Sequence, residues 1–282
     1  MKLRGKVAIV TGGGRGVGKA IALAFAREGA QLVLAARTLP ELQAAAMEVR
    51  ALGRQPLTMK VDVSERQDVE AMVASALGEF GRVDILVNNA AVQLPIGPTW
   101  ENNPDEWLRT ILINLGGMFL CCRAVVPVMV GRGAGKIISL SGGGAAYPRP
   151  YFSAYAASKA AVVRLTETLA QELKEYNIQV NAIAPGRVNT RMTEQVLAAG
   201  PAARGRELAA ARRTKEKGTS PHAAAELAVF LASTESDGLT GRLISAVWDD
   251  WRSLPSRLED VTASQLYTLR RITADTVSGG MA

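Results

Sequence analysis

Apolar residues follow two different periodicities along the chain, and the two alternate. Short apolar runs predict buried strands, and longer segments with apolar residues three or four positions apart predict amphipathic helices. The predicted strands are residues 7–10, 31–36, 56–61, 84–88, 136–140, 178–184 and 242–247. The predicted helices are residues 16–28, 39–52, 65–80, 105–130, 153–176 and 223–232. This alternation predicts parallel strands joined by right-handed crossovers, and thus an α/β fold: one doubly wound domain with a central parallel seven-stranded sheet.

Two later segments depart from this alternation. Residues 188–218 contain few strong apolar positions, which predicts a segment outside the sheet and its covering helices. Residues 253–282 follow the last predicted strand, and we expect a helix in them at about 258–271. The sequence therefore predicts a Rossmann-type domain over residues 1–252 and a C-terminal helical extension over residues 253–282.

The composition is typical of a single cytoplasmic domain. The 282 residues are 48% hydrophobic, which is ample for one buried core. Cys121 and Cys122 are neighbours in a predicted helix and point in different directions, so we expect no disulfide and a reducing compartment. The apolar run at residues 7–10 is too short for a signal peptide, and Arg123 and Pro127 interrupt the long apolar helix, so no membrane span is expected.

The formal net charge of +7 raises the possibility of nucleic-acid binding. The basic residues are scattered, however, and no aromatic-interleaved patch accompanies them. We therefore favour a solvated surface with a few cationic contacts to an anionic cofactor or substrate, and expect no nucleic-acid partner. With one histidine, His222, and no cysteine pair at ligand spacing, no metal site is expected.

A glycine-rich turn joins the first predicted strand to the first helix. Its sequence is Thr11-Gly12-Gly13-Gly14-Arg15-Gly16-Val17-Gly18. Glycine lets the backbone approach a pyrophosphate, and a helix N-terminus offers free N–H groups and the positive end of a dipole. Any tight turn can use glycine, but the position between a strand and a helix favours dinucleotide binding.

The end of the second predicted strand indicates which dinucleotide binds. An acidic residue there would bond the ribose 2′-hydroxyl of NAD and repel the 2′-phosphate of NADP. This strand ends instead in Ala36-Arg37, and Arg15 could converge with Arg37 on a phosphate. The alternative is two ordinary surface arginines. The sequence predicts NADP(H).

A tyrosine and a lysine stand four residues apart in the predicted helix at 153–176. Tyr155 and Lys159 therefore lie on one helix face. A free phenol has a pKa of about 10, and a neighbouring ammonium would lower it, so that Tyr155 could exchange a proton at neutral pH. Many surface helices contain such a pair by chance, so its meaning depends on the setting.

That setting is an ordered series of motifs. After the glycine turn come Asn88-Asn89-Ala90-Ala91, Asn114 in the long helix, serines at the end of the fifth strand, the Tyr155 helix and Pro185-Gly186. In this combination, residues 5–247 resemble the short-chain dehydrogenase/reductase family, in its ordinary-length cytosolic branch. The resemblance implies an NADP-dependent oxidoreductase that interconverts a small-molecule ketone and a secondary alcohol.

The resemblance also implies roles for individual residues. Tyr155 would donate or accept the proton, Lys159 would lower its pKa and bind the nicotinamide ribose, and Asn114 would hold a relay water. Asp62 would contact the adenine ring, and Asn88 would brace the central strand. The implied catalytic set is Asn114, Ser141, Tyr155 and Lys159. The implied cofactor-binding set is Thr11, Gly12, Gly14, Arg15, Gly16, Val17, Gly18, Arg37, Asp62, Val63, Asn88, Ala90, Tyr155, Lys159, Pro185, Gly186, Val188 and Thr190.

The serine position departs from the family pattern. Counted back from Tyr155, the serine that would polarise the carbonyl falls on Gly142, one residue after Ser141. Glycines 142–144 could let the loop turn Ser141 inward, which is our expectation; otherwise a backbone amide would take its place. Two further departures are Ala91 in place of glycine and the Trp-Asp-Asp-Trp sequence at 248–251.

The serine departure leaves a second function open. A cofactor-binding sensor or scaffold with weak or no catalysis would tolerate the loss of the serine. Retention of Asn114, Tyr155 and Lys159 together favours the enzyme, because a scaffold has no use for all three.

By the same resemblance, residues 188–218 would form a mobile substrate lid. Between Arg187 and Lys217 the chain carries eight basic and three acidic residues. Such a surplus is typical of a solvated face, or of a lid that recruits an anionic substrate. The loop 93–103 would form the other wall, where Trp100 is either a stacking surface or a packing residue.

Small residues on two long helices bear on assembly. They are Gly116, Gly117, Ala156, Ala157, Ala160 and Ala161. They would permit close approach of helices between subunits, as is common in the family, so we expect a homo-oligomer, a tetramer or a dimer. The alternative is that these residues pack on the chain's own sheet.

Overall fold

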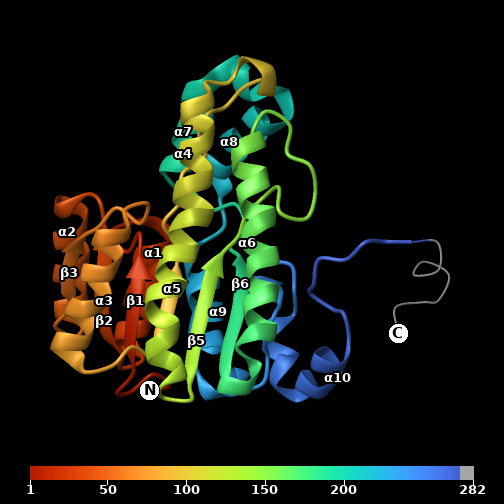
Figure 1. Ribbon diagram of the computed structural model, residues 1–282. Coiled ribbons are helices and arrows are strands. Elements are labelled where there is room, and N and C mark those ends of the chain that lie inside the picture. Colours follow the sequence, from red (N-terminus) through yellow and green to blue (C-terminus); the bar gives the residue numbers. More distant parts are fainter. Residues whose placement is uncertain (274–282) are drawn as a thin grey trace.

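Residues 1–273, which the computed structural model describes, form a sheet covered by helices on both faces (Figure 1). Neighbouring strands in the order β3-β2-β1-β4-β5-β6-β7 all pair in parallel. The strands are β1 (Val7–Thr11), β2 (Gln31–Ala36), β3 (Leu57–Lys60), β4 (Ile85–Asn88), β5 (Gly135–Leu140), β6 (Ile178–Ala184) and β7 (Leu243–Ser245). The predicted doubly wound, seven-stranded parallel sheet is confirmed.

The helices form two layers and a cap. They are α1 (Gly16–Arg27), α2 (Leu39–Ala51), α3 (Arg66–Phe80), α4 (Pro104–Ile111), α5 (Gly117–Val130), α6 (Ser153–Glu172), α7 (Arg191–Ala199), α8 (Arg204–Lys217), α9 (Pro221–Ala232) and α10 (Leu258–Ala263). One core joins α1, α2 and α9 to the sheet through Phe25, Leu42 and Phe230. A second core joins α3, α5 and α6 to the other face. Strand β1 serves both, because Val10 faces the first core and Ile9 the second.

The segment expected to lie outside the sheet forms a helical cap. Helices α7 and α8 lie above the carboxyl ends of the strands in Figure 1. Thr190 begins α7 with a capping box shared with Thr193. Few large apolar residues are needed, because the buried positions of α8 are Ala210, Ala211 and Thr214.

The long apolar helix is continuous from Pro104 to Val130, through α4, a π-helical turn at Leu112–Gly116 and α5. Arg123 and Pro127 do not interrupt it, contrary to our expectation, and by length and composition alone it could cross a membrane. In this fold its buried residues, among them Met118 and Met129, pack in the core beside the sheet. The core helix of a globular protein can be as long and as apolar as a membrane-spanning helix.

The C-terminal extension differs from the expected helix at 258–271. Helix α10 ends at Ala263, and the buried guanidinium of Arg242 then takes the carbonyl oxygens of Ser264 and Leu266 at 2.9 and 2.6 Å. Those carbonyls are therefore unavailable to a continuing helix. Tyr267 adds a backbone hydrogen bond to β7, and residues 274–282 of the predicted extension lie outside the described part of the chain.

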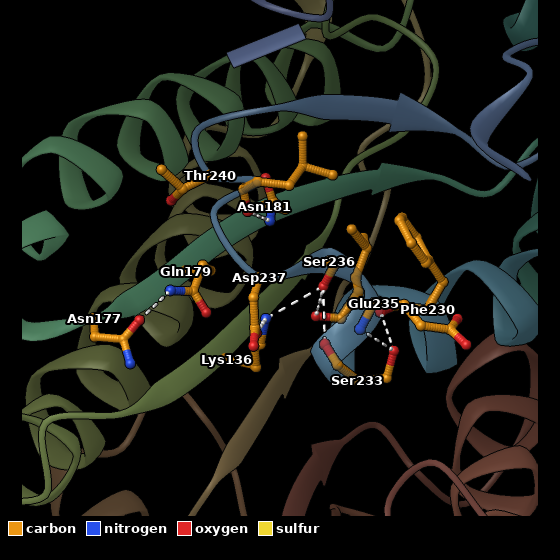
Figure 2. A network of polar contacts seen from close by, with 12 residues as sticks. Lys136, Asn177, Gln179, Asn181, Phe230, Ser233, Glu235, Ser236, Asp237 and Thr240 are labelled. Carbon is orange, nitrogen blue, oxygen red and sulfur yellow. Dashed lines mark hydrogen bonds and ion pairs between the residues drawn. The ribbon is translucent and has the colours of Figure 1, made fainter. Parts of the chain in front are cut away.

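Polar contacts hold the amino-terminal half of β5 and β6 to the turn that follows α9 (Figure 2). The Lys136 ammonium donates to Asp237 at 2.7 Å and to Ser236 at 3.3 Å. On β6, the Asn181 side chain donates to the carbonyl of Leu239 at 2.7 Å. These bonds stabilise the sheet on the side of the amino ends of β5 and β6. They lie away from the carboxyl ends of the strands, where ligands bind in open parallel sheets.

Candidate active site

A large open cleft lies over the carboxyl ends of the strands. It is lined by the glycine turn, the ends of β2 and β5, the loop 141–151 and the cap helices α7 and α8. In open parallel sheets, ligands bind at this edge where the strand order reverses, which in this chain is between β1 and β4. The cleft therefore brings most of the predicted cofactor and catalytic residues to one place.

The glycine turn has the conformation expected of a phosphate cradle. Gly12 has a φ of +64°, and a Cβ on Gly18 would lie 2.3 Å from the Gly12 carbonyl oxygen. The first turn of α1 has no side-chain cap and no acidic residue, so its N–H groups and dipole face the cleft. These features fit the pyrophosphate of a dinucleotide.

Asn89, which our sequence analysis missed as a site residue, braces this turn. Its side-chain amide donates to the carbonyl oxygens of Thr11 and Gly12 at 2.9 and 3.2 Å. The Thr11 hydroxyl in turn accepts the backbone N–H groups of Asn89 and Ala90. The Asn-Asn pair after β4 was the available signal, but which of the two faces the turn depends on the packing.

Both arginines at the predicted 2′-phosphate position face acidic partners. Arg15 pairs with Glu41 of α2 at 2.8 Å, and Arg37 lies 3.7 Å from Asp62. Burial raises the pKa of Asp62, but the hydrogen bonds from Ser64 and the nearby Arg37 outweigh it, so the pKa lies below its ordinary value. All of these residues except Ser64 line the cleft. Glu41 is the member that the sequence did not indicate.

The π-helical turn positions Asn114. One extra residue per turn in Leu112–Gly116 presents the side chain of Asn114 inward, where it bonds the backbone of Val92 in both directions at 2.8 Å. The same amide donates to the Ser158 hydroxyl at 2.9 Å. Asn114 is therefore joined to the Tyr155 helix through Ser158.

Tyr155 and Lys159 are buried side by side at the floor of the cleft. The Lys159 ammonium donates to the carbonyl of Leu140 at 2.6 Å and lies 5.7 Å from the centre of the Tyr155 ring. Burial lowers the pKa of Lys159 to about 8. Burial raises the pKa of Tyr155, and the Arg149 guanidinium partly offsets this. Two cations, Lys159 and Arg149, thus flank the phenol, with Arg149 5.3 Å from the ring centre.

The loop after β5 places a glycine, not a serine, against the phenol. A Cβ on Gly142 would lie 2.4 Å from the Tyr155 hydroxyl oxygen. Within residues 1–273 the buried Ser141 hydroxyl has no hydrogen-bond partner, and the Ser139 hydroxyl lies 3.5 Å from the side-chain amide of Asn88. The loop therefore does not bond Ser141 to Tyr155, although Ser141 lines the same cleft.

Arg149 and Glu207 form an ion pair that the sequence did not reveal. The Arg149 Nε and Nη2 atoms both lie 3.0 Å from one oxygen of Glu207, on cap helix α8. The guanidinium also lies 3.9 Å over the ring of Phe152. The pair joins the loop 141–151 to the cap across 58 residues of sequence.

Most of the remaining predicted cofactor residues surround the opening, whereas Asn88 is buried and does not line the cleft. A Cβ on Gly16 would lie 3.4 Å from Thr190 Cγ2, so the glycine turn and the start of the cap are adjacent. Gly186, with a φ of +81°, is followed by Val188, which bridges to Thr219. Val63, Pro185 and Val17 also line the cleft. Trp100 is highly exposed and does not line it.

The comparisons with known proteins show the family to which the chain is related. Residues 6–200 match the family model described as short chain dehydrogenase. The chain is 35% identical over 244 residues to the 3-oxoacyl-[acyl-carrier-protein] reductase FabG of Thermotoga maritima, with 86% of this chain and 97% of that protein covered. It is 38% identical over 245 residues to 3beta-hydroxysteroid dehydrogenase 1 of Eggerthella lenta, with 85% and 91% covered.

Solved structures show the same architecture. NAD+-bound xylitol dehydrogenase superposes with a TM-score of 0.81 at 29% identity, covering 87% of this chain and 98% of that chain. Carveol dehydrogenase from Mycobacterium avium, in complex with NAD, gives a TM-score of 0.78 at 28% identity, covering 86% and 96%. The fold thus matches proteins that bind a nicotinamide dinucleotide.

Proposed function

Because the chain belongs to the short-chain dehydrogenase family, we propose that it is an NADP(H)-dependent oxidoreductase that interconverts a ketone and a secondary alcohol. The observation that carries this proposal is the buried Tyr155–Lys159 pair on the cleft floor, with Asn114 bonded to the same helix. We also propose a cytoplasmic location. Both cysteines are free and buried, which fits a reducing compartment.

When bound, the cofactor supplies or accepts the hydride at the carbonyl carbon. The cradle of the glycine turn and the uncapped start of α1 would hold its pyrophosphate, and Arg37 and Arg15 would hold a 2′-phosphate. Arg37 replaces the acidic residue that favours NAD, and this supports NADP(H) over NAD(H). Glu41 would then compete with the phosphate for Arg15.

The side chains of the protein manage the proton. In reduction, the Tyr155 hydroxyl gives its proton to the carbonyl oxygen as the hydride arrives, and the Lys159 ammonium stabilises the phenolate that remains. With a pKa of about 8, Lys159 is largely charged at neutral pH, as this role requires. Asn114 would hold a water through which the proton is replaced, and the unpaired Ser141 hydroxyl would bond the carbonyl oxygen.

The test is an NADPH-oxidation screen over ketones, including charged ones, with Tyr155→Phe as the key variant. We expect turnover by the parent protein and a fall in kcat of about 100- to 10,000-fold in the variant, because the proton donor is lost. NADPH binding, followed by fluorescence, should be nearly unchanged. A Phe variant with full activity at saturating substrate would remove Tyr155 from this role.

A sensor or scaffold remains the second candidate function. Gly142 in place of the usual serine, and a Ser141 hydroxyl without a partner, support it. It predicts tight NADPH binding with no oxidation of NADPH by any ketone in the screen. The two functions therefore separate in a single set of measurements.

A further inference from the structure

Arg149 lies beside the proposed proton donor and is held by contacts on several sides. Its guanidinium carbon lies 5.3 Å from the centre of the Tyr155 ring, and its side chain is only 17% exposed. Phe152 supports one face, and a Cβ on Gly144 would lie 3.2 Å from the Arg149 Cβ, so the loop closes around the stem. A half-buried cation on the wall of the cleft, next to the Tyr155 phenol, is placed to contact a bound ligand.

Glu207 satisfies only one side of this guanidinium. It accepts from Nε and Nη2 with a single oxygen, and Nη1 makes no hydrogen bond within residues 1–273. Glu207 is shared, because Arg187 lies 3.8 Å from its other oxygen. Two cations therefore face one carboxylate, and the cluster keeps a net positive charge.

The surrounding wall has the same excess. Among the residues that line the cleft, Arg149 and the segment 187–217 supply seven basic side chains against two acidic ones, Glu207 and Glu216. One of the seven, Arg191, pairs with Glu41 on the cofactor side. The remaining surplus favours an anion on the substrate side of the cleft over a neutral or cationic group.

We propose that Arg149 binds a carboxylate that the substrate carries within a few bonds of its reacting carbonyl. The planar edge formed by Nη1 and Nη2 would receive the carboxylate in two parallel hydrogen bonds, while Nε stays on Glu207. The substrate class is then a short keto acid or the corresponding hydroxy acid. This inference rests on the proposed function and specifies its substrate.

The test compares a keto acid with its neutral ester in the NADPH-loaded enzyme. The probes are laevulinate with methyl laevulinate, and acetoacetate with methyl acetoacetate. The variants are Arg149→Gln and the conservative Arg149→Lys, which keeps the charge but loses the fork. Arg212→Gln is the matched control, because Arg212 is an exposed arginine of α8 that does not line the cleft.

We expect the parent enzyme to prefer the acids over the esters. Arg149→Gln should lower kcat/KM for the acids about tenfold to a hundredfold, as for a lost charge-assisted hydrogen bond, and change it little for the esters. Arg149→Lys should recover part of the loss for the acids, and Arg212→Gln should match the parent. An equal fall for acid and ester would overturn the proposal and reduce Arg149 to positioning Tyr155 or the cap.

Calorimetric titration of laevulinate into NADPH-loaded Tyr155→Phe gives a second readout that needs no turnover. Binding that Arg149→Gln weakens supports the proposal. Absence of laevulinate binding to Tyr155→Phe, or binding that the added Arg149→Gln change leaves unchanged, overturns it. Failure of the proposed function is distinct from both, because it appears as NADPH that is never oxidised with any neutral or charged ketone.

Discussion

Gly142 is the glycine of the loop after β5 that lies against the Tyr155 hydroxyl. Its Cα faces the Tyr155 hydroxyl so closely that an added methyl group would lie 2.4 Å from the oxygen. The neighbouring Gly143 is different, because a Cβ there would meet only the Arg149 side chain at 4.0 Å. The two glycines therefore form a matched pair for testing how the loop supports the phenol.

Gly142→Ala should displace the Tyr155 hydroxyl and lower kcat about a hundredfold, since a shift near 1 Å at a reacting group costs about that much. Gly143→Ala should retain nearly the parent kcat, and NADPH affinity should be similar in both. Steady-state kinetics at saturating NADPH provide the measurement. Equal activity of the two variants would show that the loop moves freely and that Gly142 does not set the position of Tyr155.

The same loop gives Ser141 a testable role. Its buried hydroxyl makes no hydrogen bond to the described residues, so no protein group competes with a substrate carbonyl oxygen for it. Ser141→Ala should lower kcat by a factor of about 100 to 1,000 if it polarises the carbonyl. Ser139→Ala should do much less. Full activity of Ser141→Ala would assign the polarising donor to a backbone amide of residues 142–144.

Lys159 couples the site to stability, because burial lowers its pKa from 10.5 to about 8. Between these values the unfolded chain binds more protons than the folded chain, so the free energy of unfolding rises with pH. At about 1.4 kcal/mol per pKa unit, the rise is of the order of 3 kcal/mol. Below pH 8 Lys159 is charged in the folded protein as well, so burial of that charge lowers the free energy of unfolding by the whole of this amount.

Urea unfolding of the cofactor-free protein between pH 8 and 10 measures this effect. The parent protein should gain stability over the window relative to Lys159→Met, which has no group to titrate. Above pH 10 the buried Tyr155, whose pKa is raised, would begin to act in the opposite direction. Parallel pH dependences of parent and variant would contradict the prediction.

At the scale of elements, β2 and α2 together place the residues on which the proposed NADP(H) preference depends. Strand β2 ends at Ala36, so Arg37 projects from its carboxyl end, and α2 brings Glu41 to Arg15. An acidic residue at the end of β2 would repel a 2′-phosphate, and this chain has Arg37 there. The proposed cofactor preference thus rests on residues of two elements and of the glycine turn.

Arg37→Asp should weaken NADPH binding by at least tenfold and NADH binding much less, because a charge-assisted contact is replaced by repulsion. Arg50→Asp, on the same helix layer but away from the cleft, is the control for a general charge change. Fluorescence titration with both cofactors measures the ratio. A parent protein with equal affinity for NADPH and NADH would refute the assignment.

At the scale of the whole molecule, the long helix has an inner face of small residues and an exposed apolar face. A Cβ on Gly117 would lie 2.6 Å from Val63, and Ala156 packs on Gly144, so these two serve the chain's own fold. The exposed face of the same helix carries Leu108 and Leu112, which are 59% and 51% exposed. Phe119 follows, also exposed. Such apolar positions fit the proposed homo-oligomer interface.

Leu112→Glu should shift the protein from a tetramer or dimer to a smaller species, because the charge would be buried between subunits. Leu39→Glu, at an exposed leucine of α2, should leave the assembly unchanged. Light scattering at micromolar concentration distinguishes the outcomes. A parent protein that is already monomeric would refute the predicted oligomer.

Local pattern was sufficient for the fold and for much of the site. Strands β2 and β6 begin and end where their apolar runs do, and Tyr155 and Lys159 face together because four residues make about one helical turn. The glycine turn lies where strand becomes helix. These features depend on interactions within a few residues, so the amino-acid order alone determines them.

Contacts between distant elements were decided only by the tertiary structure. Two ion pairs, Arg149–Glu207 and Arg15–Glu41, join segments whose approach depends on packing. The same holds for the end of α10, where Arg242 binds the carbonyl oxygen of Ser264. The loop at Gly142 is another case, because glycine leaves the backbone free and the surrounding core selects one conformation. The sequence thus determined which chemical groups the site contains, and the packed fold determined which of them face the substrate.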